Sequence, residues 1–266
     1  MSTDAATGVK RAVVARLRAA GCVFAEDESE LLIAAAATPN VLEDLIGRRV
    51  SGLPLEHILG WAAFCGLRIA VEPGVFVPRR RTEVLVEQAA ILGRPRAVVV
   101  DLCCGSGALG VALLERIPGM DLHAVDLDPA AVRCARRNVG GRGQVYQGDL
   151  FAPLPAQLRG RIELLVVNAP YVPTEAIALL PPEARQYEPR LALDGGGDGL
   201  EILRRVIAGA PEWLAPSGHL IVETSRQQAA AGLEMMSRHG LQPRLVTDDE
   251  VGATAVIGLK HSDAQA

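Results

Sequence analysis

The sequence predicts a doubly wound α/β domain, in which helices cover both faces of a mostly parallel β-sheet, preceded by a small helical domain. From residue 97 onward, short apolar runs alternate with segments whose apolar residues recur at helical spacing, and this alternation is typical of such a sheet. Before residue 51, apolar positions recur at helical spacing. We therefore expect a helical domain with a hairpin linker at residues 1–75 and the α/β domain at residues 76–266.

The first part of the chain is expected to begin with three helices, at residues 9–20, 28–37 and 41–50. From His57 to Pro78 the pattern changes to two short apolar runs separated by Gly66, which predicts a hairpin or an extended linker. Thr82 is then expected to cap a helix that runs from about Glu83 to Leu92.

The α/β domain is expected to contain seven β runs, at residues 97–102, 121–126, 144–147, 162–167, 219–224, 244–246 and 254–259. Its helices are expected at residues 107–117, 129–138, 200–214 and 226–239. In a sheet of this class the ligand binds at the carboxyl ends of the strands. The long segment 173–199, rich in Pro and Gly, is expected to form a lid over the substrate.

The composition argues against several classes of protein. A net charge of -4 gives no global electrostatic reason for binding nucleic acid, although a local basic patch remains compatible with it. The five cysteines include no Cys-x-x-Cys pair, which argues against a zinc site or a disulfide framework. Basic residues interrupt the N-terminal segment, and its longest apolar stretch is too short to span a bilayer. We expect a soluble, cytoplasmic protein with no metal site and no membrane partner.

A glycine-rich turn from Asp101 to Gly107 follows the first expected strand and opens a helix. Gly105 and Gly107 allow the backbone to approach a ligand closely, and the start of the helix offers unpaired N–H groups. Asp126 ends the second strand, where a carboxylate can bind both hydroxyls of a ribose. Nicotinamide enzymes and methyltransferases share these features, so the glycine spacing alone does not separate them.

Asp101 favours S-adenosylmethionine as the cofactor. A carboxylate at the tip of the first strand would repel a pyrophosphate, but it suits the positively charged aminoacyl end of S-adenosylmethionine. After the third strand, Asp149 is expected to accept from the adenine amino group and Leu150 to pack on the ring. The expected cofactor-binding residues are Asp101, Cys103, Cys104, Gly105, Ser106, Gly107, Asp126, Asp149, Leu150 and Asn168.

The fourth strand ends in Asn168, Ala169, Pro170 and Tyr171, which are the expected acceptor-binding and catalytic residues. An amide nitrogen is a poor nucleophile because its lone pair is delocalised into the carbonyl, so the site must orient the NH2 toward the methyl group. The side-chain oxygen of Asn168 and the main-chain carbonyl of Ala169 can each accept one N–H. Pro170 stiffens the loop, and Tyr171 offers a face to a planar amide or base.

Several segments resemble the protein-(glutamine-N5) methyltransferases that modify peptide-chain release factors, often called HemK-type enzymes. Besides the glycine-rich turn and the loop at 168–171, the matching segments are Arg49–Gly60, Pro73–Arg79, Thr82-Glu83 and Tyr187–Leu200. The resemblance implies a seven-stranded Rossmann-like methyltransferase domain that uses S-adenosylmethionine, with a helical N-terminal domain that recognises the substrate. It also implies that the acceptor is the glutamine of a Gly-Gly-Gln loop in a release factor.

Three positions depart from the pattern of this family. Cys103 stands where the family usually has glycine, Ala169 replaces the first proline of Asn-Pro-Pro-Tyr, and Arg81 replaces a glutamate near the cofactor entrance. Together they indicate a divergent paralogue, and they leave open whether the target is a release factor.

Three alternatives remain at this point. The Asn-x-Pro-aromatic loop also occurs in adenine-N6 and guanine-N2 methyltransferases that act on nucleic acids. The chain could also be a non-catalytic binding module on a decayed methyltransferase fold, or a nicotinamide dehydrogenase, which Asp101 disfavours. No direct binding of nucleic acid is expected, but the arginines could form a basic rim. These are Arg79, Arg80, Arg81, Arg133, Arg136, Arg137 and Arg142.

Overall fold

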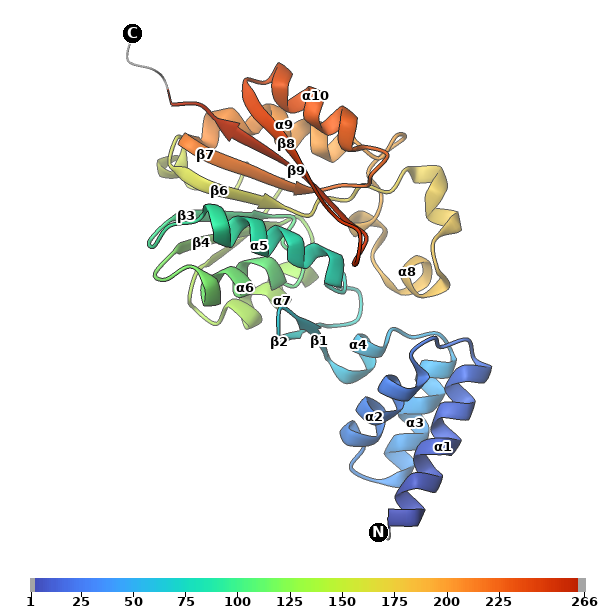
Figure 1. Ribbon diagram of the computed structural model, residues 1–266. Helices are drawn as coiled ribbons and strands as arrows, with labels where there is room; N and C mark the ends of the chain where they lie inside the picture. Colours follow the sequence, from blue (N-terminus) through green and yellow to red (C-terminus); the bar gives the residue numbers. More distant parts are fainter. Residues whose placement is uncertain (1–2, 263–266) are drawn as a thin grey trace.

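The computed structural model describes residues 3–262 and has a helical part below a larger α/β part, joined by a two-stranded hairpin (Figure 1). The helical part comprises α1 (Thr3–Ala19), α2 (Ala25–Ala35), α3 (Pro39–Val50) and α4 (Leu55–Leu59). These helices enclose a separate apolar core that includes Leu17, Leu32 and Ile46. The antiparallel hairpin that follows pairs β1 (Trp61–Phe64) with β2 (Leu67–Ala70).

The sheet of the α/β part has seven strands in the order β5-β4-β3-β6-β7-β9-β8. Their bounds are β3 (Val98–Leu102), β4 (Asp121–Asp126), β5 (Gln144–Gln147), β6 (Ile162–Val167), β7 (Leu214–Glu223), β8 (Leu241–Asp248) and β9 (Ala253–Lys260). The first five are parallel to one another, whereas β9 runs antiparallel to both of its neighbours. The order in which strands are added reverses after β5, because β4 and β5 lie on one side of β3 whereas β6 and β7 lie on the other. A crevice forms at such a reversal, outside the carboxyl ends of the strands.

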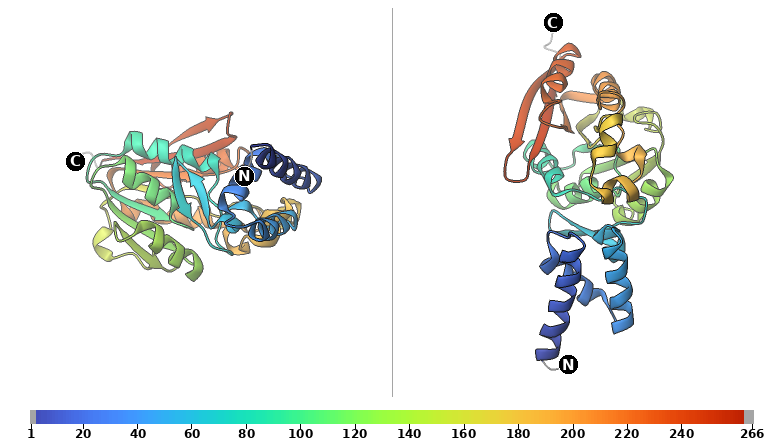
Figure 2. Two further views of the ribbon diagram at one scale, coloured as in Figure 1. Left: turned by 90° about the horizontal axis from the view of Figure 1, so that it is seen from below. Right: turned by 90° about the vertical axis from the view of Figure 1, so that its right-hand side faces the viewer.

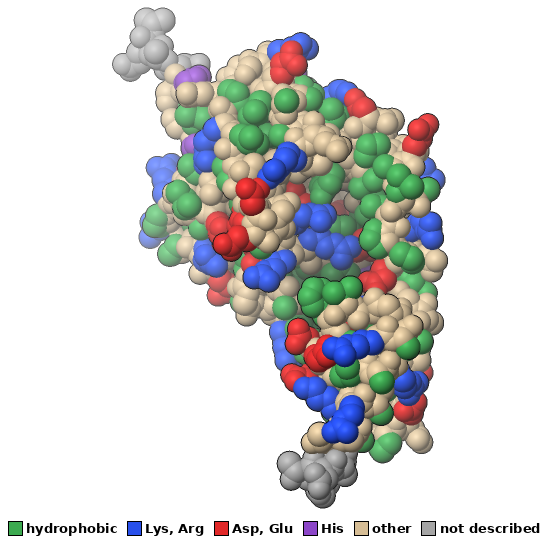
Figure 3. Space-filling model, turned by 45° about the vertical axis from the view of Figure 1, so that its right-hand side comes forward, with side chains coloured by type: hydrophobic (Ala, Val, Ile, Leu, Met, Phe, Trp, Pro, Cys, Tyr) green, Lys and Arg blue, Asp and Glu red, His purple; other side chains and the backbone are tan. Residues whose placement is uncertain are grey.

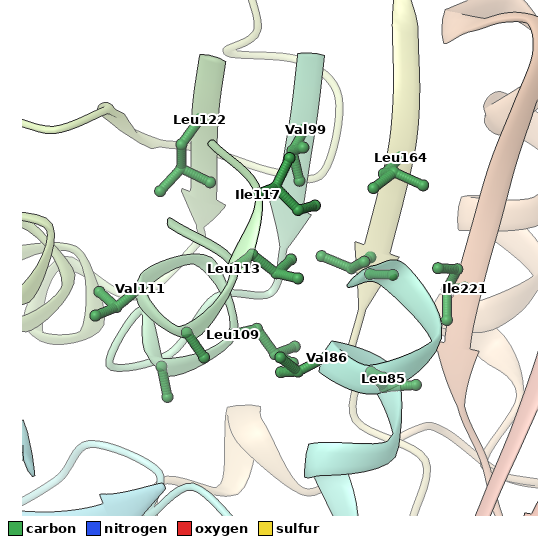
Figure 4. Packing of buried hydrophobic residues seen from close by; sticks show 14 of the residues in the cluster. Leu85, Val86, Val99, Leu109, Val111, Leu113, Ile117, Leu122, Leu164 and Ile221 are labelled. Atoms are coloured by element: carbon green, nitrogen blue, oxygen red, sulfur yellow. The ribbon is translucent and has the colours of Figure 1, made fainter. Parts of the chain in front are cut away.

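Helices cover both faces of the sheet, and Figure 2 shows the two layers from other sides. They are α5 (Glu83–Leu92), α6 (Ala108–Arg116), α7 (Pro129–Val139), α9 (Glu201–Trp213) and α10 (Ala229–Arg238). The helices α5 and α6 pack on one face, where Leu85 and Leu113 meet Val99, Leu164 and Ile221 of three strands (Figure 4). The opposite face packs against α9 and α10. Alternate strand residues therefore point into two separate cores, as expected of a sheet buried on both sides.

The predicted fold class is confirmed, and the expected strands and helices all occur, most of them within three residues of their predicted bounds. The exceptions are α1 and β7, which begin six and five residues earlier than predicted. Two short helices, α4 and α8 (Pro182–Tyr187), were not predicted. Thr82 stands at the N-cap position of α5, as expected, but its hydroxyl makes no capping hydrogen bond and instead accepts one from Asn168. The division of the chain after residue 75 stays a prediction. Among residues 3–262, no helix combines the length and the apolar character needed to cross a membrane.

Candidate functional site

A cavity of about 380 Å³ opens at the carboxyl ends of the parallel strands. Its walls come from the glycine-rich turn, from the residues that follow β4, β5 and β6, from the segment that precedes α5, and from residues 180–193. Figure 3 shows this side of the molecule, where basic side chains lie in the hollow between the α/β part and the helical part. The segment expected to be a lid contains α8 and forms one wall of the cavity.

The glycine-rich turn adopts a backbone that few side chains tolerate. Gly105 has φ +55° and Gly107 has φ +77°, and a Cβ on Gly107 would lie 3.2 Å from Ala135 of α7. Cys103 has φ +58°, a left-handed conformation that costs a residue other than glycine about 1–2 kcal/mol. The backbone is therefore strained at Cys103, the position where the family usually has glycine, and this residue forms part of the cavity wall. Cys104 is buried, and both thiols have pKa values raised by burial.

The Asp126 carboxylate is fixed at the end of β4 by two backbone donors. Its Oδ2 accepts from the Gly105 N–H at 2.8 Å, and its Oδ1 accepts from the Asp128 N–H at 2.9 Å. Burial raises the pKa of this carboxyl above its usual range, although the two backbone donors oppose the shift. The side chain lines the cavity, so it is held ready for a polar ligand.

Asp101 lies behind the turn and not on the cavity wall. The side chain is fully buried, and its Oδ2 accepts from the Gly110 N–H at 3.0 Å. Its Oδ1 has no hydrogen-bond partner among residues 3–262. Burial raises the pKa of this carboxyl to about 7. Direct contact between Asp101 and a ligand therefore stays a prediction, and a bridging water is one way to connect them.

The raised pKa of Asp101 predicts a specific loss of stability with rising pH. A carboxyl whose pKa is higher in the folded chain than in the unfolded chain stabilises the fold while it is protonated. This stabilisation is complete below the unfolded pKa of about 4 and is lost progressively as the pH rises to the folded pKa of about 7. Relative to Asp101→Asn, the wild-type free energy of unfolding should fall by about 2–3 kcal/mol between pH 5 and pH 8. Urea unfolding at both pH values measures this difference.

The control is the same substitution at the exposed Asp249, which should leave the pH profile of wild type unchanged. Parallel profiles for wild type and Asp101→Asn would contradict the prediction.

Asp149 and Leu150 follow β5, and both line the cavity. The Asp149 carboxylate is half-exposed and pairs with Arg205 of α9, a partner that the sequence did not suggest. Leu150 is nearly buried and has φ +47°. Of the other expected cofactor residues, Gly105 and Ser106 line the cavity, whereas Gly107 lies where the turn meets α7.

The loop from Asn168 to Tyr171 forms the adjoining wall of the cavity. The Asn168 Nδ2 donates to the Thr82 hydroxyl at 3.3 Å, and Thr82 is buried. This contact leaves the Asn168 side-chain oxygen without a hydrogen bond to residues 3–262, and the Ala169 carbonyl is equally free within that range. Both residues line the cavity, so its wall includes two residues that each have an acceptor without a partner in that range. The Tyr171 hydroxyl is held from behind, by Arg81 and Glu223.

The glycine-rich segment 195–199 packs against the backbone of the loop, a role that the sequence did not predict. A Cβ on Gly195 would lie 2.8 Å from the Pro170 carbonyl oxygen, and a Cβ on Gly199 would lie 2.3 Å from that of Tyr171. The Gln228 side chain donates to the same Tyr171 oxygen at 2.9 Å. Only glycine fits at this distance, so the glycines following Asp194 allow the two segments to pack backbone to backbone.

The arginines expected in a basic rim are mostly engaged within the molecule. Arg79 pairs with the buried Glu188 at 2.6 Å, and Arg81 pairs with Glu223. Arg137 and Arg142 pair with acidic residues on the surface. No observation tests whether the rim binds a partner.

Comparisons with known proteins agree on the class of protein, which is a methyltransferase. A family model described as methyltransferase small domain matches residues 66–179. The release factor glutamine methyltransferase of Geobacter sulfurreducens is 42% identical over 217 residues, which span 80% of this chain and 75% of that protein. The ribosomal protein uL3 glutamine methyltransferase of Bradyrhizobium diazoefficiens is 40% identical, over 72% of this chain and 64% of that protein.

Among solved structures, a T. thermophilus 16S rRNA N2 methyltransferase in complex with AdoMet and guanosine superimposes with a TM-score of 0.56. It is 18% identical and covers 76% of this chain and 50% of that chain, so the likeness concerns the fold.

Proposed function

This chain belongs to the release factor glutamine methyltransferase family, and on that premise we propose that its cavity brings S-adenosylmethionine and a protein glutamine together for methyl transfer to the side-chain nitrogen. The chain is a methyltransferase, with the fold and the relatives of that class. The observation that carries the finer proposal is a pair of acceptors in residues that line the cavity, the Asn168 side-chain oxygen and the Ala169 carbonyl, neither of which has a hydrogen-bond partner among residues 3–262.

The two acceptors match the two N–H groups of a primary amide. When each accepts one N–H, the amide plane is fixed, and the nitrogen lone pair can point out of that plane toward the cofactor. Thr82 contributes by accepting from the Asn168 NH2, which leaves the Asn168 oxygen available to the acceptor amide. The nitrogen sheds one proton after the methyl group has arrived, so no strong general base is needed.

The residues of the adjoining wall fit S-adenosylmethionine, which supplies an electrophilic methyl group when bound. Asp126 presents a carboxylate fixed by Gly105 and Asp128, as binding two ribose hydroxyls requires. Asp149 and Leu150 would take the adenine, and the turn from Cys103 to Gly107 would pass beneath the aminoacyl end. The Asp101 Oδ1 has no partner in the part of the chain that the structure describes, and this supports a cationic or hydrogen-bonding group nearby, because a buried carboxyl oxygen without a partner is costly.

The acceptor protein is proposed to be a peptide-chain release factor, methylated at the glutamine of its Gly-Gly-Gln loop. Relatives that act on release factors and a relative that acts on ribosomal protein uL3 have similar identities to this chain. The loss of a proline at Ala169 leaves the carbonyl in place, so either protein remains chemically compatible with the site. A cytoplasmic location, where translation proteins are found, is part of the same proposal, as is the absence of direct nucleic-acid binding.

One experiment separates these acceptors. The protein is incubated with labelled S-adenosylmethionine and, in parallel, with release factor, uL3, RNA and DNA, and the methyl group is located by mass spectrometry. We expect label on the glutamine of the Gly-Gly-Gln loop. Label on uL3 alone would keep the chemistry but change the partner, and label on nucleic acid alone would overturn the proposal. Absence of cofactor binding at millimolar concentration in calorimetry would indicate a non-catalytic module.

A further inference from the structure

Tyr171 of the acceptor loop contacts two residues, Arg81 and Glu223, that have no role in the function proposed above, and the three form one cluster. Arg81, just before α5, donates from Nη2 to the Tyr171 hydroxyl at 2.8 Å and from Nε to Glu223 Oε1 at 3.1 Å. The Tyr171 hydroxyl in turn donates to the same Glu223 oxygen at 3.1 Å. The three residues come from segments far apart in the chain, at the start of α5, after β6 and at the end of β7.

The cluster contains one buried negative charge and one cation that reaches it from the cavity. The Glu223 side chain is 1% exposed, and its Oε2 has no hydrogen-bond partner among residues 3–262. The Arg81 side chain is 43% exposed and lines the cavity. Arg81 is the cation that pairs with this buried carboxylate, and its removal would leave Glu223 buried without that partner, which is strongly destabilising.

The phenol of Tyr171 is the element that this cluster orients. Burial and the adjacent Glu223 raise the pKa of Tyr171 to about 12, so the hydroxyl stays protonated and can donate to Glu223 while it accepts from Arg81. With both functions of the hydroxyl satisfied, the ring has a single orientation. That ring lines the cavity in the same loop as Asn168.

We propose that Arg81 is a positioning residue for the acceptor site, and that it acts by holding the Tyr171 ring against the place where the planar acceptor amide binds. Arg81 itself is not a catalytic residue, because its guanidinium acts through Tyr171 and Glu223. This inference rests on the proposed function for the identity of the acceptor. The sequence showed Arg81 only as a reversed charge near the cofactor entrance, whereas the structure supplies the partners that balance this charge.

The test compares Arg81→Gln, Arg81→Lys, Tyr171→Phe and the double variant Arg81→Gln/Tyr171→Phe. We expect Arg81→Gln to lower kcat/KM for a Gly-Gly-Gln peptide by about tenfold, mainly through KM, with the cofactor Kd within about threefold of wild type. Arg81→Lys should recover part of the loss, because it restores the charge but not both donor positions. The kcat/KM of the double variant should be no lower than that of the more impaired single variant, because both changes break the same hydrogen bond between Arg81 and Tyr171.

The control is Arg94→Gln, which removes an exposed arginine paired with Glu163 near the amino ends of the strands, away from the cavity. It should keep the kinetics of wild type. An unchanged kcat/KM for Arg81→Gln, a loss confined to the cofactor Kd, or additive effects in the double variant would each overturn the inference. A wild-type protein that methylates no glutamine would instead overturn the proposed function.

A second readout does not depend on activity. The Tm values of wild type, the two single variants and the double variant form a cycle, and we expect the two Tm losses to be non-additive. If Arg81→Gln does not fold, the cycle is repeated with Arg81→Lys in its place. Additive Tm changes would show that Arg81 and Tyr171 act independently, and the inference would then be wrong.

Discussion

Replacement of Asn168 by alanine is expected to abolish glutamine methylation while the cofactor still binds within about tenfold of its wild-type affinity, a difference of ~1.4 kcal/mol. Alanine removes the side-chain oxygen that would accept one N–H of the acceptor amide, and only the Ala169 carbonyl would remain. One hydrogen bond lets the amide rotate about it, so the lone pair is no longer aligned with the methyl group. Most of the cavity wall assigned to the cofactor is untouched by the change.

The measurements are single-turnover methylation of a Gly-Gly-Gln peptide and cofactor binding by calorimetry. The control is Asn40→Ala, the same substitution at an exposed position of α3 in the helical part. We expect wild-type turnover from the control. A normal rate for Asn168→Ala would remove Asn168 from the chemistry, and a cofactor affinity reduced a hundredfold would reassign it to the cofactor.

The sequence predicted the α/β part well because each strand and helix leaves a local signal. The run 97–102 is apolar except for Asp101, and residues 98–102 of it form β3 at the centre of the sheet, with neighbours on both sides. The helices α4 and α8 left no such signal, since five or six residues complete barely more than one turn. They are held by tertiary contacts, such as the hydrogen bond from the Tyr187 hydroxyl to the Ser51 carbonyl.

The candidate site was predictable where position along a strand determines it. Asp126 ends β4 and Asn168 directly follows β6, and these two strands flank β3. Both residues were predicted to belong to the site because the carboxyl ends of parallel strands lie at the same edge of the sheet. What sequence could not supply are the contacts between distant segments. Three hydrogen bonds at the site join residues more than 50 positions apart, and no local periodicity encodes such pairs. They are Thr82 with Asn168, Arg81 with Tyr171, and Arg205 with Asp149.

Arg49 is another residue whose contacts the sequence could not predict. It begins the segment Arg49–Gly60, which resembles the family, but nothing in that segment indicates its partners. In the structure its side chain is 7% exposed and forms two hydrogen bonds with Glu28 of α2, at 2.6 and 3.1 Å. Another of its nitrogens donates to the Leu53 carbonyl and to Glu183 of α8. Arg49 therefore joins three helices, and it links the helical part to the segment that forms one wall of the cavity.

Replacement of Arg49 by methionine is expected to lower the free energy of unfolding by about 3–5 kcal/mol, because it leaves the Glu28 carboxylate buried without a cation. Adding Glu28→Gln to that variant should recover most of the loss, since the remaining buried group is neutral. Glu183→Gln provides the matched control, because it removes the other carboxylate partner, whose side chain is 45% exposed, and should cost less than about 1 kcal/mol. Urea unfolding followed by circular dichroism measures all three. If Glu183→Gln proved as costly as Arg49→Met, the stabilisation would come from the link to α8 and not from the buried pair.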